Sequence, residues 1–227
     1  MKCRSVFWVC ALVITAGCGG SVTVNGGGGE GGGGGAGGST GPCAGYEDEP
    51  STGSVVIRIR NDDFVPVYLP GGCDGLAYGL VSNSGTSATY NFDGSCLQTC
   101  EDLQTQPQYE CGACAPLAFL LNPGESVEAT WTGTGLISDS MPASCFADNL
   151  GGTSCSRIIG AANGQYTVSI TPYSGCDAGC ECDPATHECF GYVGGVEGTM
   201  SSATFTFPQA TSVDLAIPPC SFGCAGG

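Results

Sequence analysis

Cysteine is the residue that most restricts what this chain can fold into. The 227 residues contain 17 cysteines. Three of them, Cys3, Cys10 and Cys18, precede residue 19, which leaves an even set of fourteen in the rest of the chain. An even number of closely spaced cysteines in an exported protein indicates a disulfide framework, here of seven bridges. The fourteen are Cys43, Cys73, Cys96, Cys100, Cys111, Cys114, Cys145, Cys155, Cys176, Cys180, Cys182, Cys189, Cys220 and Cys224.

The first 17 residues have the composition of an export signal. Lys2 and Arg4 provide a short positive region, and residues 6–16 form an apolar stretch of eleven residues. A stretch this short cannot cross a hydrocarbon core of ~30 Å as a helix, so it predicts a cleaved signal peptide. The chain is therefore expected to leave the cytoplasm.

The residues at positions 15–18, Thr-Ala-Gly-Cys, resemble the lipobox of bacterial lipoproteins. The resemblance implies a signal peptide over residues 1–17, cleavage before Cys18 and lipidation of Cys18. Glycine at position 19 permits sorting to the outer membrane, where we expect the lipid anchor to hold the protein. An ordinary secretory signal cut nearby is the alternative, and it would also export the chain. Lipidation of Cys18 keeps the remaining cysteines even in number, whereas a free thiol there would make them odd.

Residues 18–42 are predicted to be the lipidated cysteine and a disordered tether. Glycine accounts for 14 of the 23 residues from 19 to 41, and side chains this small cannot form a core. A glycine-rich coil of this length has a root-mean-square span of roughly 25 Å. Such a segment resembles the tethers of myxobacterial lipoproteins of uncharacterised function.

The chain is strongly acidic. Removal of Lys2 and Arg4 with the signal would change its formal net charge from −16 to −18, leaving Arg58, Arg60 and Arg157 as the basic residues. Such a surface repels phosphate backbones and anionic lipid headgroups. We therefore expect no nucleic-acid partner, and membrane association only through the lipid anchor.

Residues 43–227 are predicted to form one disulfide-rich, all-β domain. In residues 54–60, Val55, Ile57 and Ile59 alternate with Arg58 and Arg60, which is the pattern of a half-buried strand. Similar runs predict an antiparallel β-sandwich of about 8–9 short strands. The predicted strands are 54–60, 65–69, 76–81, 87–92, 116–121, 125–131, 164–170, 199–207 and 212–217, with 65–69 at a sheet edge because of its internal proline.

The apolar side of each run defines the expected core. A slip of one residue would bury charged side chains instead, so the pattern fixes the inward face of each strand. Trp131 is predicted to lie at the centre, because its large ring can contact both sheets. The expected core residues are Val55, Ile57, Ile59, Val127, Trp131, Tyr166, Val168, Ile170, Phe205, Phe207, Val213 and Leu215.

Two segments resemble Ig-like domains of the intracellular proteinase inhibitor type. The turn at 121–126, Leu-Asn-Pro-Gly-Glu-Ser, precedes a strand that carries Trp131, and 164–168, Gly-Gln-Tyr-Thr-Val, begins a later strand. The resemblance covers about fifty residues and implies an Ig-like β-sandwich. The cysteine-rich insertions near 96–114 and 176–189 are a departure from that family.

The cysteines at 96, 100, 111 and 114 also have the outline of a zinc site, and 111–114 alone resembles a thioredoxin-type redox motif. In an exported chain we favour disulfides over both, and we expect no metal and no cofactor. The spacing predicts pairs within 96–114, a pair between Cys145 and Cys155, and two pairs within 176–189. The other four would tie the chain ends to the sandwich.

The sequence contains a single histidine, His187, which we expect to be exposed and without a catalytic role. Because a Ser-His-Asp or Cys-His device needs an imidazole and no nucleophile-elbow motif is present, we predict no catalytic residues. The acidic runs 47–49 and 62–63 could bind Ca²⁺ only weakly, since the spaced ligand loop is missing.

We therefore predict a non-catalytic, lipid-anchored envelope lipoprotein that serves a structural or recognition role toward a protein or glycan. The rival hypothesis is an extracytoplasmic hydrolase that uses paired carboxylates, which would need two carboxyl groups ~5–10 Å apart in a pocket. A third hypothesis is a proteinase inhibitor with a rigid exposed loop.

Overall fold

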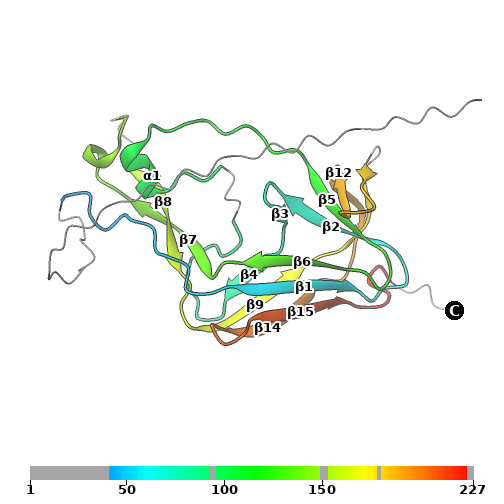
Figure 1. Cartoon of the computed structure of the whole chain (residues 1–227). Coiled ribbons are helices and arrows are strands. Elements are labelled where there is room, and N and C mark those ends of the chain that lie inside the picture. Colours follow the sequence, from blue (N-terminus) through cyan, green and yellow to red (C-terminus); the bar gives the residue numbers. More distant parts are fainter. Residues whose placement is uncertain (1–40, 93–95, 149–152, 178–179, 224–227) are drawn as a thin grey trace, which may run out of the picture. The chain divides into compact units, whose positions relative to one another are not determined.

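Strands make up almost all of the regular structure (Figure 1). The computed structural model describes residues 41–92, 96–148, 153–177 and 180–223, so the predicted signal peptide, Cys18 and nearly all of the tether lie outside the described residues. The described part confirms the all-β class. Its elements are β1 (Val55–Asn61), β2 (Val67–Gly72), β3 (Gly75–Leu76), β4 (Gly79–Ser82), α1 (Cys100–Thr105), β5 (Leu117–Leu121), β6 (Ser126–Trp131), β7 (Thr134–Ser140), a 3₁₀ turn (Ala143–Cys145), β8 (Ser154–Gly160), β9 (Gly164–Ile170), β10 (Tyr173–Cys176), β11 (Glu181–Cys182), β12 (Glu188–Phe190), β13 (Val193–Glu197), β14 (Ser201–Phe207) and β15 (Ser212–Ile217).

Two three-stranded sheets contain most of the strands with clear alternation. Sheet 1 has the order β15-β1-β6, and sheet 2 has the order β14-β9-β4. The pairing of β1 with β6 is antiparallel, but β1 pairs with β15 in parallel. This pair departs from the antiparallel prediction. It is possible because β1 and β15 lie at opposite ends of the domain sequence, so no short turn has to join them.

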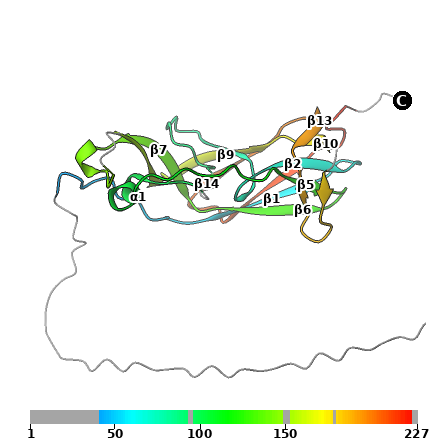
Figure 2. The same ribbon diagram turned by 90° about the horizontal axis from the view of Figure 1, so that it is seen from above.

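Sheet 3 is the largest, with the order β11-β12-β5-β2-β10-β13 and with β3 added beside β2. Strands β2 and β5 lie above β1 and β6 in Figure 1, and over them when seen from above in Figure 2. The prediction that 65–69 is an edge strand is wrong. Pro66 comes just before the strand, which begins at Val67, so it removes no hydrogen bond from the ladder and β2 lies between two partners.

The core lies between the inward faces of these sheets. The predicted inward positions are buried in the structure, except that Val127 is half-buried and packs against the same cluster. Trp131 is 3% exposed and contacts four aromatic rings, with centroid distances of 5.0–6.0 Å to Tyr90, Tyr166, Phe205 and Phe207. Its central position is therefore confirmed.

A second, smaller core lies beside a hairpin that was not predicted from the sequence. Strands β7 and β8 pair along their whole length, and α1 packs against β8. The buried residues here are Cys100, Leu103, Met141, Cys145, Phe146 and Cys155. The strand expected at 87–92 is instead irregular and makes one isolated bridge, between Thr89 and Leu136 of β7. The run 76–81 is divided between β3 and β4.

Disulfides connect parts of the chain that the predicted clusters kept separate. The bridges are Cys43–Cys145, Cys73–Cys114, Cys96–Cys111, Cys100–Cys155, Cys176–Cys180 and Cys182–Cys189, and Cys220 is also disulfide-bonded. The predicted pairing of Cys145 with Cys155 is wrong, because these two residues bind different partners. Cys100 and Cys114 likewise pair outside their own cluster. Spacing identified short-loop candidates but could not detect contacts created by tertiary packing.

Candidate functional site

A cavity of about 760 Å³ lies between the edge strand β6 and the residues around the β2–β3 turn. The strand contributes the inward positions Val127, Ala129 and Trp131. Phe119 of β5 and the irregular segment 90–92 complete the wall. Because Val127 and Ala129 are small and β6 has no neighbour on its outer side within sheet 1, this end of the core is left unfilled.

The β2–β3 turn is held in place by its backbone and by a disulfide. Gly72 and Gly75 are paired across the turn, and Gly75 has φ of +117°, a conformation that favours glycine. Cys73 is bonded to Cys114, which connects the turn to the segment leading into β5. The turn therefore places Asp74 at the cavity on a cross-linked support.

Aromatic rings provide much of the cavity surface. Tyr78, Tyr90, Phe92, Phe119 and Trp131 all line it. The rings of Tyr90 and Trp131 lie edge to face at 6.0 Å, which fixes both orientations. Burial raises the pKa of Tyr78 to about 12, so its phenol stays neutral at physiological pH. The wall is thus rigid and largely apolar.

Several hydrogen-bond donors in this wall are already bonded within the protein. The indole Nε1 of Trp131 donates to the carbonyl oxygen of Thr134 at 2.8 Å. The amide Nδ2 of Asn91 donates to the carbonyl oxygen of Tyr78 at 2.5 Å. The hydroxyl of Tyr90 shares a hydrogen bond with that of Thr86.

Three of the lining residues carry a carboxylate. Glu128 is on the outward side of β6, where its Oε1 lies 2.7 Å from Nη2 of Arg58. This hydrogen bond raises the pKa of Arg58. Asp74 and Glu188 come from the β2–β3 turn and from β12, and both are exposed residues of the lining. Glu188 pairs across the ladder with Phe119, which also lines the cavity.

The cysteines considered as a zinc or redox site do not form one. Cys111 is bonded to Cys96, whereas Cys114 is bonded to Cys73, so the 111–114 motif contains no internal disulfide. A different group, Cys180, Cys182 and Cys189, has sulfur atoms within 4.8 Å of one another. These sulfurs belong to the Cys176–Cys180 and Cys182–Cys189 bridges, so they lack the thiolate charge that a metal ligand needs.

His187 differs from the exposed residue that was expected. Its side chain is only 29% exposed, and its Nδ1 lies 3.5 Å from Oε2 of Glu125. The same oxygen accepts a hydrogen bond from the backbone N–H of Asn122. The histidine therefore connects the loop before β12 to the turn before β6.

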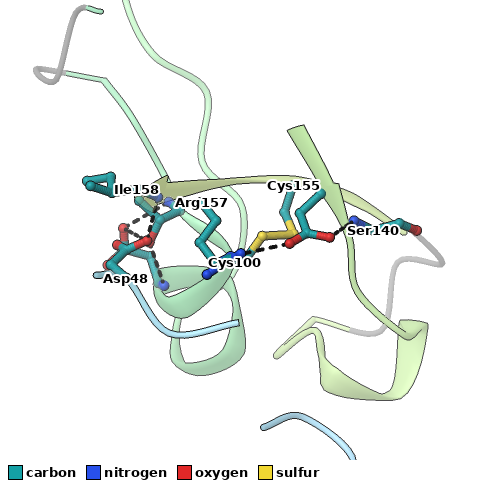
Figure 3. The surroundings of a disulfide bond; sticks show 9 residues. Asp48, Cys100, Ser140, Cys155, Arg157 and Ile158 are labelled. Carbon is teal, nitrogen blue, oxygen red and sulfur yellow. Dashed lines mark hydrogen bonds and ion pairs between the residues drawn. A yellow bond between two sulfur atoms is a disulfide. The ribbon is translucent and has the colours of Figure 1, made fainter. Parts of the chain in front are cut away.

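The acidic run 47–49 binds the backbone of β8 (Figure 3). Oδ1 of Asp48 accepts from the N–H of Ile158 at 2.8 Å, and Oε2 of Glu49 accepts from that of Gly160 at 2.9 Å. Arg157 also contacts Oε1 of Glu49 at 3.3 Å. These carboxylates attach the segment to the hairpin, so their hydrogen bonds account for an acidic run that sequence alone left as a weak calcium candidate.

The carboxylates of the second acidic run, 62–63, also bind other groups of the protein. Asp62 pairs with Arg60, whose hydrogen bond lowers the pKa of the Asp62 carboxyl. Asp63 is 5% exposed, and its carboxylate accepts hydrogen bonds from the backbone N–H groups of Cys220 and Ser221 at 3.1 and 2.9 Å. It thereby connects the turn after β1 to the C-terminal segment.

Asp63→Ala should lower the free energy of unfolding by about 3 kcal/mol, because the buried N–H of Ser221 and the half-buried N–H of Cys220 would lose a charged acceptor. Urea denaturation followed by circular dichroism measures the change. Asp62→Ala removes the same charge from a neighbour whose side chain is 33% exposed, and it should leave the denaturation midpoint nearly unchanged. Equal effects of the two substitutions would contradict this role of Asp63.

None of the cavity residues was predicted from the sequence to bind a ligand or to take part in catalysis. The lining comes from separate segments that meet only in the folded chain, and no short motif marks their proximity. The nearest local signal was the glycine-rich turn around Asp74, which predicts a bend but gives no chemistry.

Comparison with known proteins gives no relative from which a function could be inferred: no family model, no curated protein and no solved structure matches this chain. Within the described residues, no helix is long and apolar enough to span a membrane. The disulfides of the described domain are typical of an extracytoplasmic protein.

Proposed function

We propose that this chain is a lipid-anchored, non-catalytic lipoprotein of the outer membrane that binds a ligand in the cavity beside β6. The observation that carries the binding role is the 760 Å³ aromatic cavity, a volume within the range of about 300–1,000 Å³ common for small-molecule sites. The ligand could be a free small molecule or one group of a larger protein or glycan partner.

The disulfides support the proposed location. All thirteen cysteines in the described part of the chain are disulfide-bonded. Such bonds persist in oxidising compartments and are rare in the cytosol, so they agree with the export signal.

The rigidity of the cavity supports a binding role. One wall is β6, which is held by its ladder to β1, and the β2–β3 turn on the other side is fixed by Cys73–Cys114. A preformed site loses little conformational entropy when a ligand enters, so a modest contact area can give useful affinity.

The anchor is tested by Cys18→Ser. The variant should move from the membrane fraction to the soluble fraction, because the thiol that accepts the lipid is gone. Intact-mass analysis of the mature wild-type protein should show the added acyl chains. A mature protein without them would refute the anchor.

Binding is tested with Nile red, an uncharged dye whose fluorescence increases in apolar surroundings. The wild-type domain should bind one dye molecule, whereas Ala129→Trp should abolish the signal, because the new side chain fills the cavity. Ala216→Trp, on the exposed face of β15, is the matched control and should bind normally. Normal binding by a folded Ala129→Trp variant would show that the cavity is not the site.

The rival hydrolase is favoured by one observation, the presence of Asp74 and Glu188 among the cavity residues. Paired carboxylates at such a site are the groups used in glycoside hydrolysis. A panel of chromogenic glycosides distinguishes the two functions: activity that disappears in both Asp74→Asn and Glu188→Gln would establish the hydrolase and overturn the non-catalytic assignment.

A further inference from the structure

The cavity wall offers mainly two kinds of interaction. The first is contact with apolar and aromatic surface, from Leu76, Val127 and the five rings named above. The second is hydrogen-bond acceptance by carboxylate oxygens, which Asp74 and Glu188 contribute to the lining. A matching ligand therefore needs an apolar body and a hydrogen-bond donor.

Hydrogen bonds that already exist within the wall also bear on the class of ligand. The indole N–H of Trp131 and one amide N–H of Asn91 are bound to backbone carbonyls, and the hydroxyl of Tyr90 is bound to Thr86. A ligand that took its hydrogen bonds from these three groups would first have to break the internal bonds. Polar groups left without a hydrogen-bond partner inside the cavity would weaken the binding of such a ligand.

The charge of the lining residues also favours a ligand with a positive group. Among the described residues that line the cavity, the charged ones are Asp74, Glu128 and Glu188, and the whole chain has a formal net charge of −16. Among the described lining residues there is no lysine or arginine, and Arg58, the partner of Glu128, lies on the outward face of sheet 1. The potential in the cavity is therefore negative, which attracts cations and repels anions.

We infer that the cavity selects an amine, as a protonated ammonium group carried on an aromatic or aliphatic body, with Asp74 and Glu188 accepting its N–H groups. The inference rests on the proposed binding function and specifies its ligand class. The apolar body lies against Phe119 and Val127, and the lining rings of Tyr78 and Phe92 are of the kind that attracts a cation.

The test compares three probes that share a phenylbutyl body: 4-phenylbutylamine, 4-phenyl-1-butanol and 4-phenylbutyrate. Isothermal titration calorimetry at low ionic strength measures each dissociation constant on the disulfide-intact protein. The amine should bind about tenfold more tightly than the alcohol, because it forms charge-assisted hydrogen bonds, and the acid should bind most weakly.

Two double variants identify the groups responsible. Asp74→Asn with Glu188→Gln should remove the preference for the amine while retaining binding of the alcohol. Asp214→Asn with Glu197→Gln removes the same charge from exposed positions on β15 and β13 and should leave the preference intact. Circular dichroism and thermal unfolding verify that both proteins are folded.

The possible outcomes separate this inference from the proposed function. If the alcohol or the acid binds as well as the amine and Ala129→Trp abolishes that binding, the amine inference is overturned but the binding cavity stands. If no probe binds and Nile red also fails to bind, both are overturned. A preference for the amine that survives the Asp74 and Glu188 substitutions would overturn the assignment of these two carboxylates.

Discussion

Replacing Trp131 by alanine should lower the free energy of unfolding by about 3–5 kcal/mol, the range measured when large aromatic residues are removed from protein cores. The ring is 3% exposed and contacts Tyr90, Tyr166, Phe205 and Phe207. Its loss would leave a void next to an existing cavity, and would also free the Thr134 carbonyl from its indole partner.

Chemical denaturation followed by far-ultraviolet circular dichroism measures this effect, because the substitution removes the indole that fluorescence would report. Phe190→Ala is the matched control, since Phe190 is also aromatic but 68% exposed. Trp131→Phe should recover part of the loss by restoring the ring contacts without the indole hydrogen bond. A decrease below 1 kcal/mol for Trp131→Ala would show that this ring does not organise the core.

Removal of the Cys100–Cys155 bridge should also lower the stability strongly. The bond closes a loop of 55 residues and connects α1 to β8. In the chain-entropy model a loop of this length contributes about 4 kcal/mol. Both sulfurs also lie in the small second core, so replacing them with alanine removes buried contacts as well.

The double substitution Cys100→Ala with Cys155→Ala avoids a free thiol. Denaturation gives the global loss, and hydrogen exchange should show the largest increase in α1, β7 and β8. The control is Cys176→Ala with Cys180→Ala, whose short loop contributes only about 2 kcal/mol in the same model. Uniform exchange across the domain after loss of Cys100–Cys155 would contradict a local role for this bridge.

The two cores differ in how well the sequence predicted them. In β1, β9, β14 and β15 the apolar residues recur at every second position, so the buried face could be identified directly. The strands β7 and β8 lack that regular alternation, because their hairpin packs against a disulfide and a helix rather than against a second sheet. The helix did have a signal, since Thr99 and Asp102 form a capping box, but six residues are too few for helical periodicity to appear.

The candidate site could not be predicted from the sequence, for a related reason. Val127 was correctly placed on the inward side of β6, which Ala129 shares, but a period-2 pattern cannot show that the space in front of them is empty. That space depends on where the β2–β3 turn and Phe119 stop, which the Cys73–Cys114 bridge and sheet 3 determine.

What the sequence by itself determined is the all-β class, the inward face of the main strands and the disulfide-rich character of the domain. These follow from the local alternation of apolar residues and from the cysteine content, both of which can be determined from the amino-acid sequence directly. The sequence also predicted the two local bridges within 176–189, whereas the tertiary structure alone decided the long-range cysteine pairs, the parallel contact of β1 with β15 and the existence of the cavity. Each of these joins residues far apart in the chain, and such contacts depend on packing and loop closure throughout the domain rather than on any local pattern.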